Sequence, residues 1–170
     1  MSKTKKVSVR RASENDPAYL TAEKLILEHH PDLVEAKVVL LYNTAWSVDP
    51  GGRVVLGKCK IASAADRALV GEVDVIVTLN AAFWFDEQTS SEQREALLDH
   101  ELCHAHLQYD GEGEPVQDEL GRLVFKLRHH DVEEFEDVIK RHGTYKRDLE
   151  RFAAALLTQR EIEKLGGEPK

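Results

Sequence analysis

The chain has 170 residues, of which 42% are hydrophobic and 32% charged, the composition of a globular domain. Its net charge of −8 at pH 7 excludes a general electrostatic attraction of the whole surface to nucleic acid. No apolar run approaches the roughly 20 residues that would span a bilayer, and the N-terminus lacks the apolar core of a secretory signal, so we expect a cytoplasmic protein. Cys59 and Cys103 form no CxxC pair, which argues against a disulfide framework or a zinc knuckle and predicts two reduced, mostly buried thiols.

Residues 1–15 are predicted to form a basic arm. Lysine and arginine runs of this kind are usually solvated tails, and binding of nucleic acid is the less favoured interpretation. Asp16 followed by Pro17 is typical of a helix start, and Pro31 ends the helix that we expect there.

Three strands are predicted next, at residues 38–42, 53–61 and 73–79. Before the third strand, Ser63 and Asp66 have the spacing of a capping box, which predicts a short helix that ends at Gly71. The third strand, VDVIVTL, is either an edge strand able to pair with an extended peptide or an interior strand, and the sequence favours neither.

A long helix is predicted from the capping residues Thr89 to Ser91 as far as about Gln108, followed by a loop and a short strand at residues 122–128. Two more helices should follow. The first begins at the capping pair Asp131 and Glu134 and ends before Gly143, and the second ends before Gly166. Strands that precede helices indicate an α+β fold, with a small sheet of three to four mostly antiparallel strands packed on the long helix and additional C-terminal helices. We expect residues 16–170 to form a single domain.

The long helix contains His100-Glu101-Leu102-Cys103-His104, which fits H-E-x-x-H. Residues four apart on a helix differ by about 40° in direction, so His100 and His104 can share one metal ion. Glu101 lies roughly 100° from His100, where it can reach a metal-bound water without binding the metal. Imidazoles suit zinc, which would lower the pKa of the water toward about 7 while the carboxylate acts as general base. Histidines that merely fill this otherwise apolar helix are disfavoured, because their burial is costly unless something binds them.

A catalytic zinc ion usually has a third protein ligand. His130 is the favoured candidate because it directly precedes Asp131, the expected helix cap, which would hold it rigidly. Asp110 follows His104 by six residues, but Leu107 occupies the position at which the compact arrangement of this kind uses glycine to turn the chain. The remaining candidates are His129, Glu133 and Glu134.

The segment ALLDHELCHAHL, followed by HHDVEEFEDVIKRHG, resembles the SprT-like zincin metalloproteases, especially the group described as putative phage metallopeptidases. The resemblance covers about residues 38–143. It implies a zincin-like fold, with His100, His104 and His130 as zinc ligands and Glu101 as the catalytic glutamate. SprT-like proteins often carry a zinc ribbon or a DNA-binding segment, and neither is readable in this chain.

These observations predict a zinc-dependent peptide hydrolase that acts on peptide or protein substrates. The alternatives are a non-catalytic, metal-binding interaction module of phage or mobile-element origin, and a DNA-dependent protease that uses the basic arm. Oxyanion stabilisation needs a further donor near the metal, for which Tyr109, His142 and Tyr145 are unranked candidates that packing explains better. His106 is predicted to lie behind the ligands or on the surface.

Overall fold

The computed structural model describes residues 8–48, 50, 52–132, 136–145 and 147–164, and it divides the chain into two compact units, 1–128 and 129–170. A single domain over residues 16–170 stays a prediction. No helix in the described part of the chain is both long enough and apolar enough to cross a membrane.

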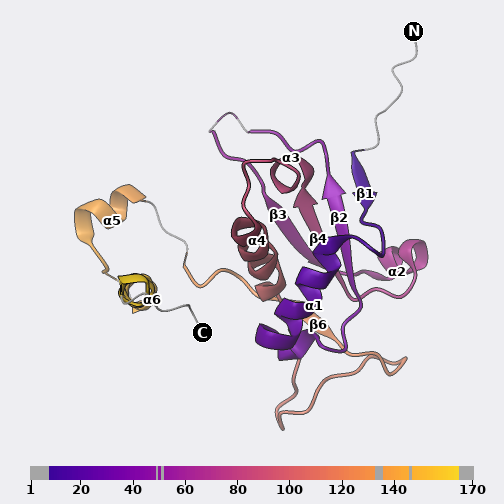
Figure 1. The fold of residues 1–170 in the computed structure, drawn as a ribbon. Coiled ribbons are helices and arrows are strands. Elements are labelled where there is room, and N and C mark those ends of the chain that lie inside the picture. The colour runs from indigo at the N-terminus through magenta and orange to yellow at the C-terminus, as the bar shows by residue number, and fades with distance from the viewer. Residues whose placement is uncertain (1–7, 49, 51, 133–135, 146, 165–170) are drawn as a thin grey trace. The chain divides into compact units, whose positions relative to one another are not determined.

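The first unit contains a four-stranded sheet and a separate two-stranded one (Figure 1). The strands are β1 (Val9–Arg11), β2 (Val38–Asn43), β3 (Gly57–Ile61), β4 (Val75–Asn80), β5 (Ala105–Leu107) and β6 (Phe125–Leu127). The larger sheet has the order β1-β2-β4-β3, in which only β2 and β4 are parallel, and β5 pairs with β6 in antiparallel fashion. The predicted α+β class and the small, mostly antiparallel sheet are therefore confirmed.

The helices of this unit begin where their capping residues predict. They are α1 (Pro17–His29), the 3-10 turn η1 (Pro31–Leu33), α2 (Ala64–Val70), α3 (Ala81–Trp84) and α4 (Ser91–Cys103). Asp16 accepts a hydrogen bond from the Ala18 N–H at 3.0 Å, and Ser63 and Asp66 cap α2 reciprocally. Helix α3 and the turn η1 have no counterpart among the predicted elements.

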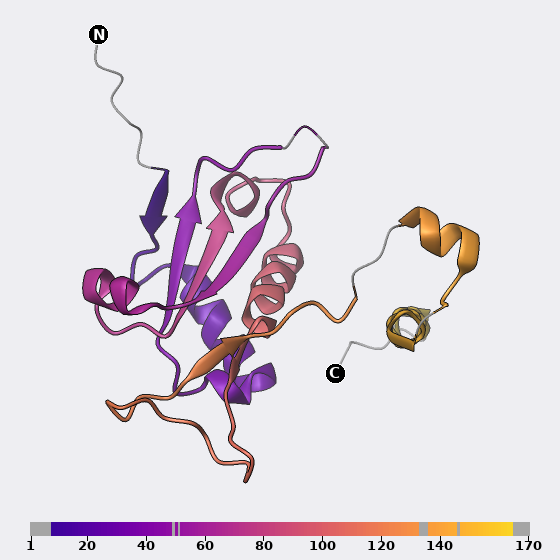
Figure 2. The ribbon, with the colours of Figure 1, turned by 180° about the vertical axis from the view of Figure 1, so that it is seen from behind.

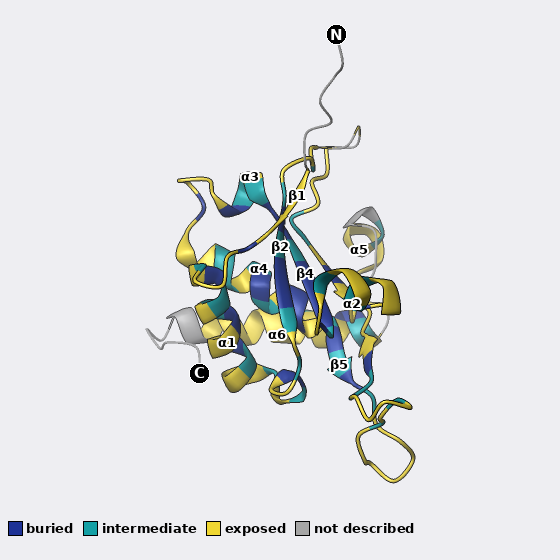
Figure 3. Cartoon of the chain, turned by 90° about the vertical axis from the view of Figure 1, so that its right-hand side faces the viewer, coloured by how far each residue is buried: buried dark blue, intermediate teal, exposed yellow. Residues whose placement is uncertain are grey.

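The two faces of the larger sheet are covered by different helices. Helices α1 and α4 lie on one face, and α2 lies on the other (Figures 1 and 2). Alternate residues of β2 and β4 supply the two cores, as the period of two in a strand requires. The main core contains Leu40, Tyr42, Val75, Val77, Leu79, Leu98 and Leu102, and the smaller core contains Val39, Ala62, Val73 and Ile76. Figure 3 shows the buried strip along the sheet.

Strand β4 lies inside the sheet, paired with β2 on one side and β3 on the other. The possibility that VDVIVTL is an edge strand for peptide binding is therefore wrong, because both of its edges are already hydrogen-bonded. The edge strands are β1 and β3, and β3 begins at Gly57 and not at Arg53 as predicted.

At the N-terminus, β1 falls within the stretch predicted as an arm. Its backbone pairs with β2, from Val9 opposite Asn43 to Arg11 opposite Leu41. The guanidinium of Arg10 lies 5.2 Å from the ring centre of Tyr42, a cation–π contact that helps to hold the strand.

Helix α4 is shorter than predicted. It ends at Cys103, and residues 105–107 form β5 instead of a further helical turn. Ala105 and Leu107 alternate with His106 in burial and pair with β6, so tertiary packing prevails over local helix propensity. The H-E-x-x-H segment consequently lies at the C-terminal end of the helix and not in its middle.

The second unit contains α5 (Glu136–His142) and α6 (Arg147–Lys164). Gly143 has a φ of 66° and its N–H donates to the Ile139 carbonyl at 2.8 Å, so the predicted end of α5 is confirmed. The prediction that Asp131 caps this helix is wrong, because Val132 is not helical and α5 begins at Glu136. Glu134 of the predicted capping pair lies outside the described residues.

Candidate metal centre

The start of α4 is fixed by two sets of hydrogen bonds. The Ser90 hydroxyl accepts from the Gln93 N–H at 3.2 Å, and the Gln93 side chain accepts from the Ser90 N–H at 2.9 Å. Arg94 donates to the carbonyls of Trp84 and Asp86 at 2.7 and 2.8 Å. The helix therefore has a defined position before the residues of the metal-binding motif are reached.

The packing of α4 then determines where its polar residues point. Leu98 and Leu102 are fully buried against the sheet, whereas His100 is exposed and His104 is half-buried. The two imidazoles are one helical turn apart, and their ring centres are 5.1 Å apart. The predicted placement of both histidines on one face of the helix is confirmed.

The backbone of Arg128 orients His104. The Arg128 N–H donates to the His104 carbonyl at 2.6 Å, and His104 Nδ1 lies 2.7 Å from the Arg128 carbonyl oxygen. A carbonyl can only accept, so Nδ1 carries the hydrogen and Nε2 keeps the lone pair needed to bind a metal. The end of β6 therefore selects the ligand atom of His104.

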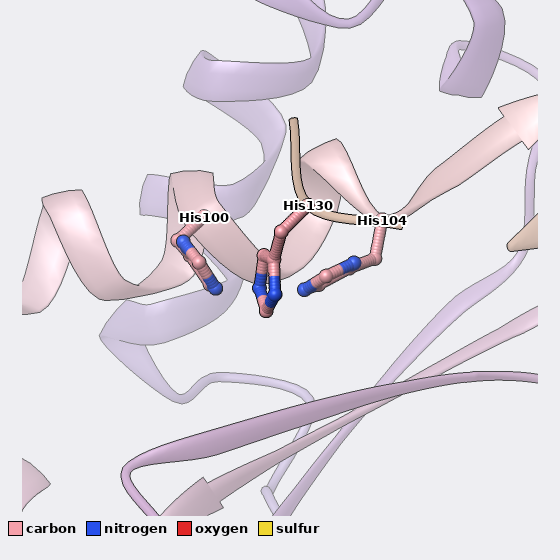
Figure 4. Close-up of side chains that lie close together, drawn as sticks. All are labelled: His100, His104 and His130. Carbon is pink, nitrogen blue, oxygen red and sulfur yellow. The ribbon is translucent and has the colours of Figure 1, made fainter. Parts of the chain in front are cut away.

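His130 follows Arg128 by two residues, so the chain alone keeps its Cα within about 7 Å of that anchored residue. One ring nitrogen of each of His100, His104 and His130 lies within 4.8 Å of the others. Figure 4 shows the three imidazoles converging, two from the end of α4 and one from the segment after β6. The structure thus brings together all three residues predicted as metal ligands.

Glu101 lies on another side of the helix, between α4 and β3. Its side chain is almost fully buried, with 3% exposed, and one carboxylate oxygen accepts a hydrogen bond from the Cys59 backbone N–H. Burial raises the pKa of the Glu101 carboxyl, while the charge of His104 and the Cys59 hydrogen bond act in the opposite direction. Glu101 directly follows His100 and precedes His104 by three residues, so its carboxylate lies at the same end of α4 as the two imidazoles.

The other oxygen of this carboxylate, Oε2, is buried and has no hydrogen-bond partner within the described part of the chain. A buried carboxylate oxygen without a partner is costly, and a water molecule held beside the imidazoles would satisfy it. Three imidazole donors with one open position and an adjacent carboxylate are the donor set of a catalytic metal site. The residues present therefore fit a bound metal ion.

The other proposed third ligands lie elsewhere or outside the described residues. The Asp110 carboxylate accepts the backbone N–H groups of Glu112 and Glu114 in an exposed turn, and these hydrogen bonds lower its pKa. Its role is therefore to shape the loop at residues 109–121. His129 is not among the residues that the structure groups into a metal-binding cluster, and Glu133 and Glu134 lie outside the described residues.

The residues suggested for supporting roles have other contacts. The Tyr109 hydroxyl donates to Asp32 Oδ1 at 2.8 Å, and Tyr145 is 54% exposed. His106 lies on β5, half-buried, and its Nδ1 has no partner among the described residues. His142 ends α5. None of these contacts identifies a donor for an oxyanion.

Sequence reasoning missed three parts of this centre: Gly57, the Cys59 N–H and the Arg128 carbonyl. Two of them act through backbone groups, which carry no signature in the residue type. Gly57 alone offered a signal, as a glycine within a predicted strand, which often marks a close approach to another group.

Comparison with known proteins gives one match. The model of a family described as putative phage metallopeptidase matches residues 10–157, most of the chain. No curated protein and no solved structure matches.

Proposed function

Because this chain belongs to the putative phage metallopeptidase family, we propose that it is a zinc-dependent peptide hydrolase with its active centre at the end of α4. The observation that carries the proposal is the convergence of His100, His104 and His130 within 4.8 Å, beside the buried carboxylate of Glu101. Family membership supports a metal-dependent peptidase, and the three nitrogen donors favour zinc over a hard cation such as magnesium.

Each residue of this centre has one role. His100, His104 and His130 would hold the zinc ion, with Nε2 as the ligand atom of His104. A bound zinc ion would supply Lewis acidity and lower the pKa of its water to about 7. Glu101 would take the proton of the attacking water at Oε2 and later give it to the departing amine. Its raised pKa suits this role, because a carboxylate with a higher pKa takes a proton from water more readily.

The outer edge of β3 is the proposed binding place for the peptide. On the β4 side, the Leu56 carbonyl accepts from the Asn80 N–H at 2.7 Å, and the Ala62 N–H donates to the Asp74 carbonyl at 2.8 Å. Backbone direction alternates along a strand, so the groups of Gly57 and Cys59 point away from β4, and the Cys59 N–H indeed meets Glu101. An extended peptide that adds to this edge would lie beside the proposed base.

The finer classification is part of the same proposal. A helix carrying HELCH beside an edge strand supports a zincin-like fold, and HDVEEF after β6 supports the SprT-like group.

Substitution of Glu101 by glutamine tests the function. Glutamine keeps the size of the side chain and an acceptor for the Cys59 N–H, but it cannot take a proton. We expect the purified zinc-loaded variant to lose peptide hydrolysis while it retains one equivalent of zinc at the histidines. Full activity in this variant would refute the assignment of the base.

A second comparison separates the enzyme from an interaction module. An unstructured protein such as casein is incubated with the wild type, the Glu101 variant, and the wild type treated with chelator. The enzyme yields fragments only in the first sample. Association with a partner but no fragments in any sample would favour the non-catalytic module.

A further inference from the structure

A second group of potential metal ligands lies on another side of α4. His30, Asp99 and Cys103 each offer one ligand atom, and these atoms all lie within 4.8 Å of one another. All three residues belong to the first unit and have described side chains. The proposed active centre uses none of them.

The geometry of α4 separates this group from the first one. Asp99 and Cys103 are four residues apart, so they share a side of the helix just as His100 and His104 do. Each is one residue earlier than the corresponding histidine, which rotates the pair by about 100° around the helix axis. One helix thus presents two pairs of potential ligands in two directions.

His30 completes the group from the junction between α1 and η1. Its side chain is only 10% exposed, and Nε2 lies 2.6 Å from Asp99 Oδ1. Its backbone is held on both sides, because its N–H donates to the Ile26 carbonyl at 3.1 Å and its carbonyl accepts from Leu33 at 2.9 Å. The imidazole is therefore fixed in place by the fold before any ligand binds.

Cys103 supplies the third atom. We expected this thiol to be buried, but the structure places it on the exposed side of the helix. The buried side is occupied by Glu101 and Leu102, and a residue directly after them points toward solvent. A thiol at this position is accessible to ions in solution.

We propose that His30, Asp99 and Cys103 form a second cation site, for a borderline or soft transition-metal ion such as zinc, cobalt or cadmium. Imidazole and thiolate together select such ions over calcium or magnesium, which prefer oxygen. The cation takes the place of the hydrogen between His30 Nε2 and Asp99, the imidazole stays neutral with its hydrogen on Nδ1, and the proton of the Cys103 thiol passes to solvent. Three protein ligands leave one coordination position for water. A bound ion links the end of α1 to the end of α4.

Cobalt(II) distinguishes the two sites, because only the second one contains a thiolate. We expect cobalt added to the metal-free full chain to give thiolate-to-cobalt charge-transfer absorption in the near ultraviolet. Cys103→Ser should remove this band and leave the visible bands of cobalt bound by histidines. Cys59→Ala is the matched control, and the band should persist in it. His30→Ala should weaken the affinity of the second site for cobalt, measured from the thiolate band. Loss of a residue that only hydrogen-bonds to a metal ligand already costs roughly tenfold in affinity, so we expect a loss of at least that size.

Protection of the thiol gives a second measurement that needs no substitution of the site. Cadmium or zinc should slow alkylation of Cys103 by iodoacetamide in the wild type. The same protection should remain in a His100→Ala/His104→Ala double variant, in which the first site is broken. Circular dichroism checks that each variant is folded.

Two results would overturn the proposal. The first is saturation with cobalt without any thiolate band and without protection of Cys103, which would leave the His30–Asp99 contact as a hydrogen bond that joins α1 to α4. The second is a band that survives Cys103→Ser but disappears in Cys59→Ala.

Discussion

Gly57 is packed directly against the side chain of Glu101. A Cβ atom built on Gly57 would lie 2.7 Å from Cγ and Cδ of Glu101 and closer still to Oε1, well inside the distance that real side chains tolerate. Glu101 cannot retreat easily, because Leu98 and Leu102 fix the helix that carries it and Cys59 holds its carboxylate. The Glu101 carboxylate can therefore occupy this position only because Gly57 has no side chain.

Replacement of Gly57 by alanine should move Glu101 and reduce turnover. A displacement of about 1 Å of a catalytic group can cost on the order of 100-fold in rate, and we expect a loss of that size in kcat. Zinc content should not change, because the three atoms nearest to an added Cβ all belong to Glu101 and not to a proposed metal ligand. Gly111→Ala is the matched control, since an added Cβ there meets nothing within 4 Å and its φ is ordinary. Equal activity of the two variants would show that the position of Glu101 does not depend on Gly57.

Zinc affinity should separate His130 from its neighbour His129. His130→Ala removes one of three converging imidazoles, whereas His129→Ala removes one that belongs to no described cluster. We expect His130→Ala to bind zinc about 10–100-fold more weakly than His129→Ala. This is the loss of affinity that follows removal of a residue that only hydrogen-bonds to a metal ligand, and loss of a ligand itself should cost no less. Competition with a chromogenic chelator measures both constants. Weaker binding in the His129 variant would transfer the third-ligand role to that residue.

Much of the fold follows from local sequence signals. The first N–H groups of a helix have no partner within the helix, and a capping side chain can accept from them. Helices therefore begin at Asp16-Pro17, at Ser63 with Asp66, and at Ser90 with Gln93. His100 and His104 converge because the helical repeat alone places them together. These features depend on residues close in sequence, so they can be predicted from it.

The features that were missed depend on contacts between distant segments. The sequence predicts that the helix containing HELCH continues to Gln108, but residues 105–107 pair with β6 and form a strand. The partner of Glu101 is a backbone N–H on β3, and that of His104 is a carbonyl at the end of β6. The order of strands likewise depends on long-range pairing, because β4 pairs with both β2 and β3, which makes β4 an interior strand and leaves β3 at an edge.

The cap of α4 offers a test of stability that leaves the metal ligands untouched. Ser90 and Gln93 satisfy each other's backbone N–H groups, and the loss of such a cap costs about 1 kcal/mol. Ser90→Ala should therefore lower the free energy of unfolding by about that amount in urea titrations. Ser91→Ala is the control, because the Ser91 hydroxyl only donates to the neighbouring exposed Glu92. A loss in the Ser91 variant as large as that in the Ser90 variant would contradict this account of the helix start.

The two cysteines should differ strongly in reactivity, although the sequence suggests the same burial for both. Cys59 is 7% exposed within the main core, and burial, with a further contribution from the charge of Glu101, raises the pKa of its thiol to about 12. Only the thiolate reacts with alkylating agents, so Cys59 should be inert at pH values near neutrality. Cys103 lies on the exposed side of α4, so burial does not keep reagents from its thiol.

Native, metal-free protein treated with iodoacetamide at about pH 8 should therefore gain one adduct, at Cys103, while protein in urea should gain two. Intact-mass spectrometry counts the adducts, and peptide mapping locates them. The Cys103→Ser variant should gain none when native and one in urea, which checks that the reagent reaches both states. Rapid labelling of Cys59 in the native chain would mean that β3 separates readily from α4. In that case the core contact that positions Glu101 would open on the time scale of the experiment, and the tight fit between Gly57 and Glu101 could not hold the carboxylate beside the imidazoles.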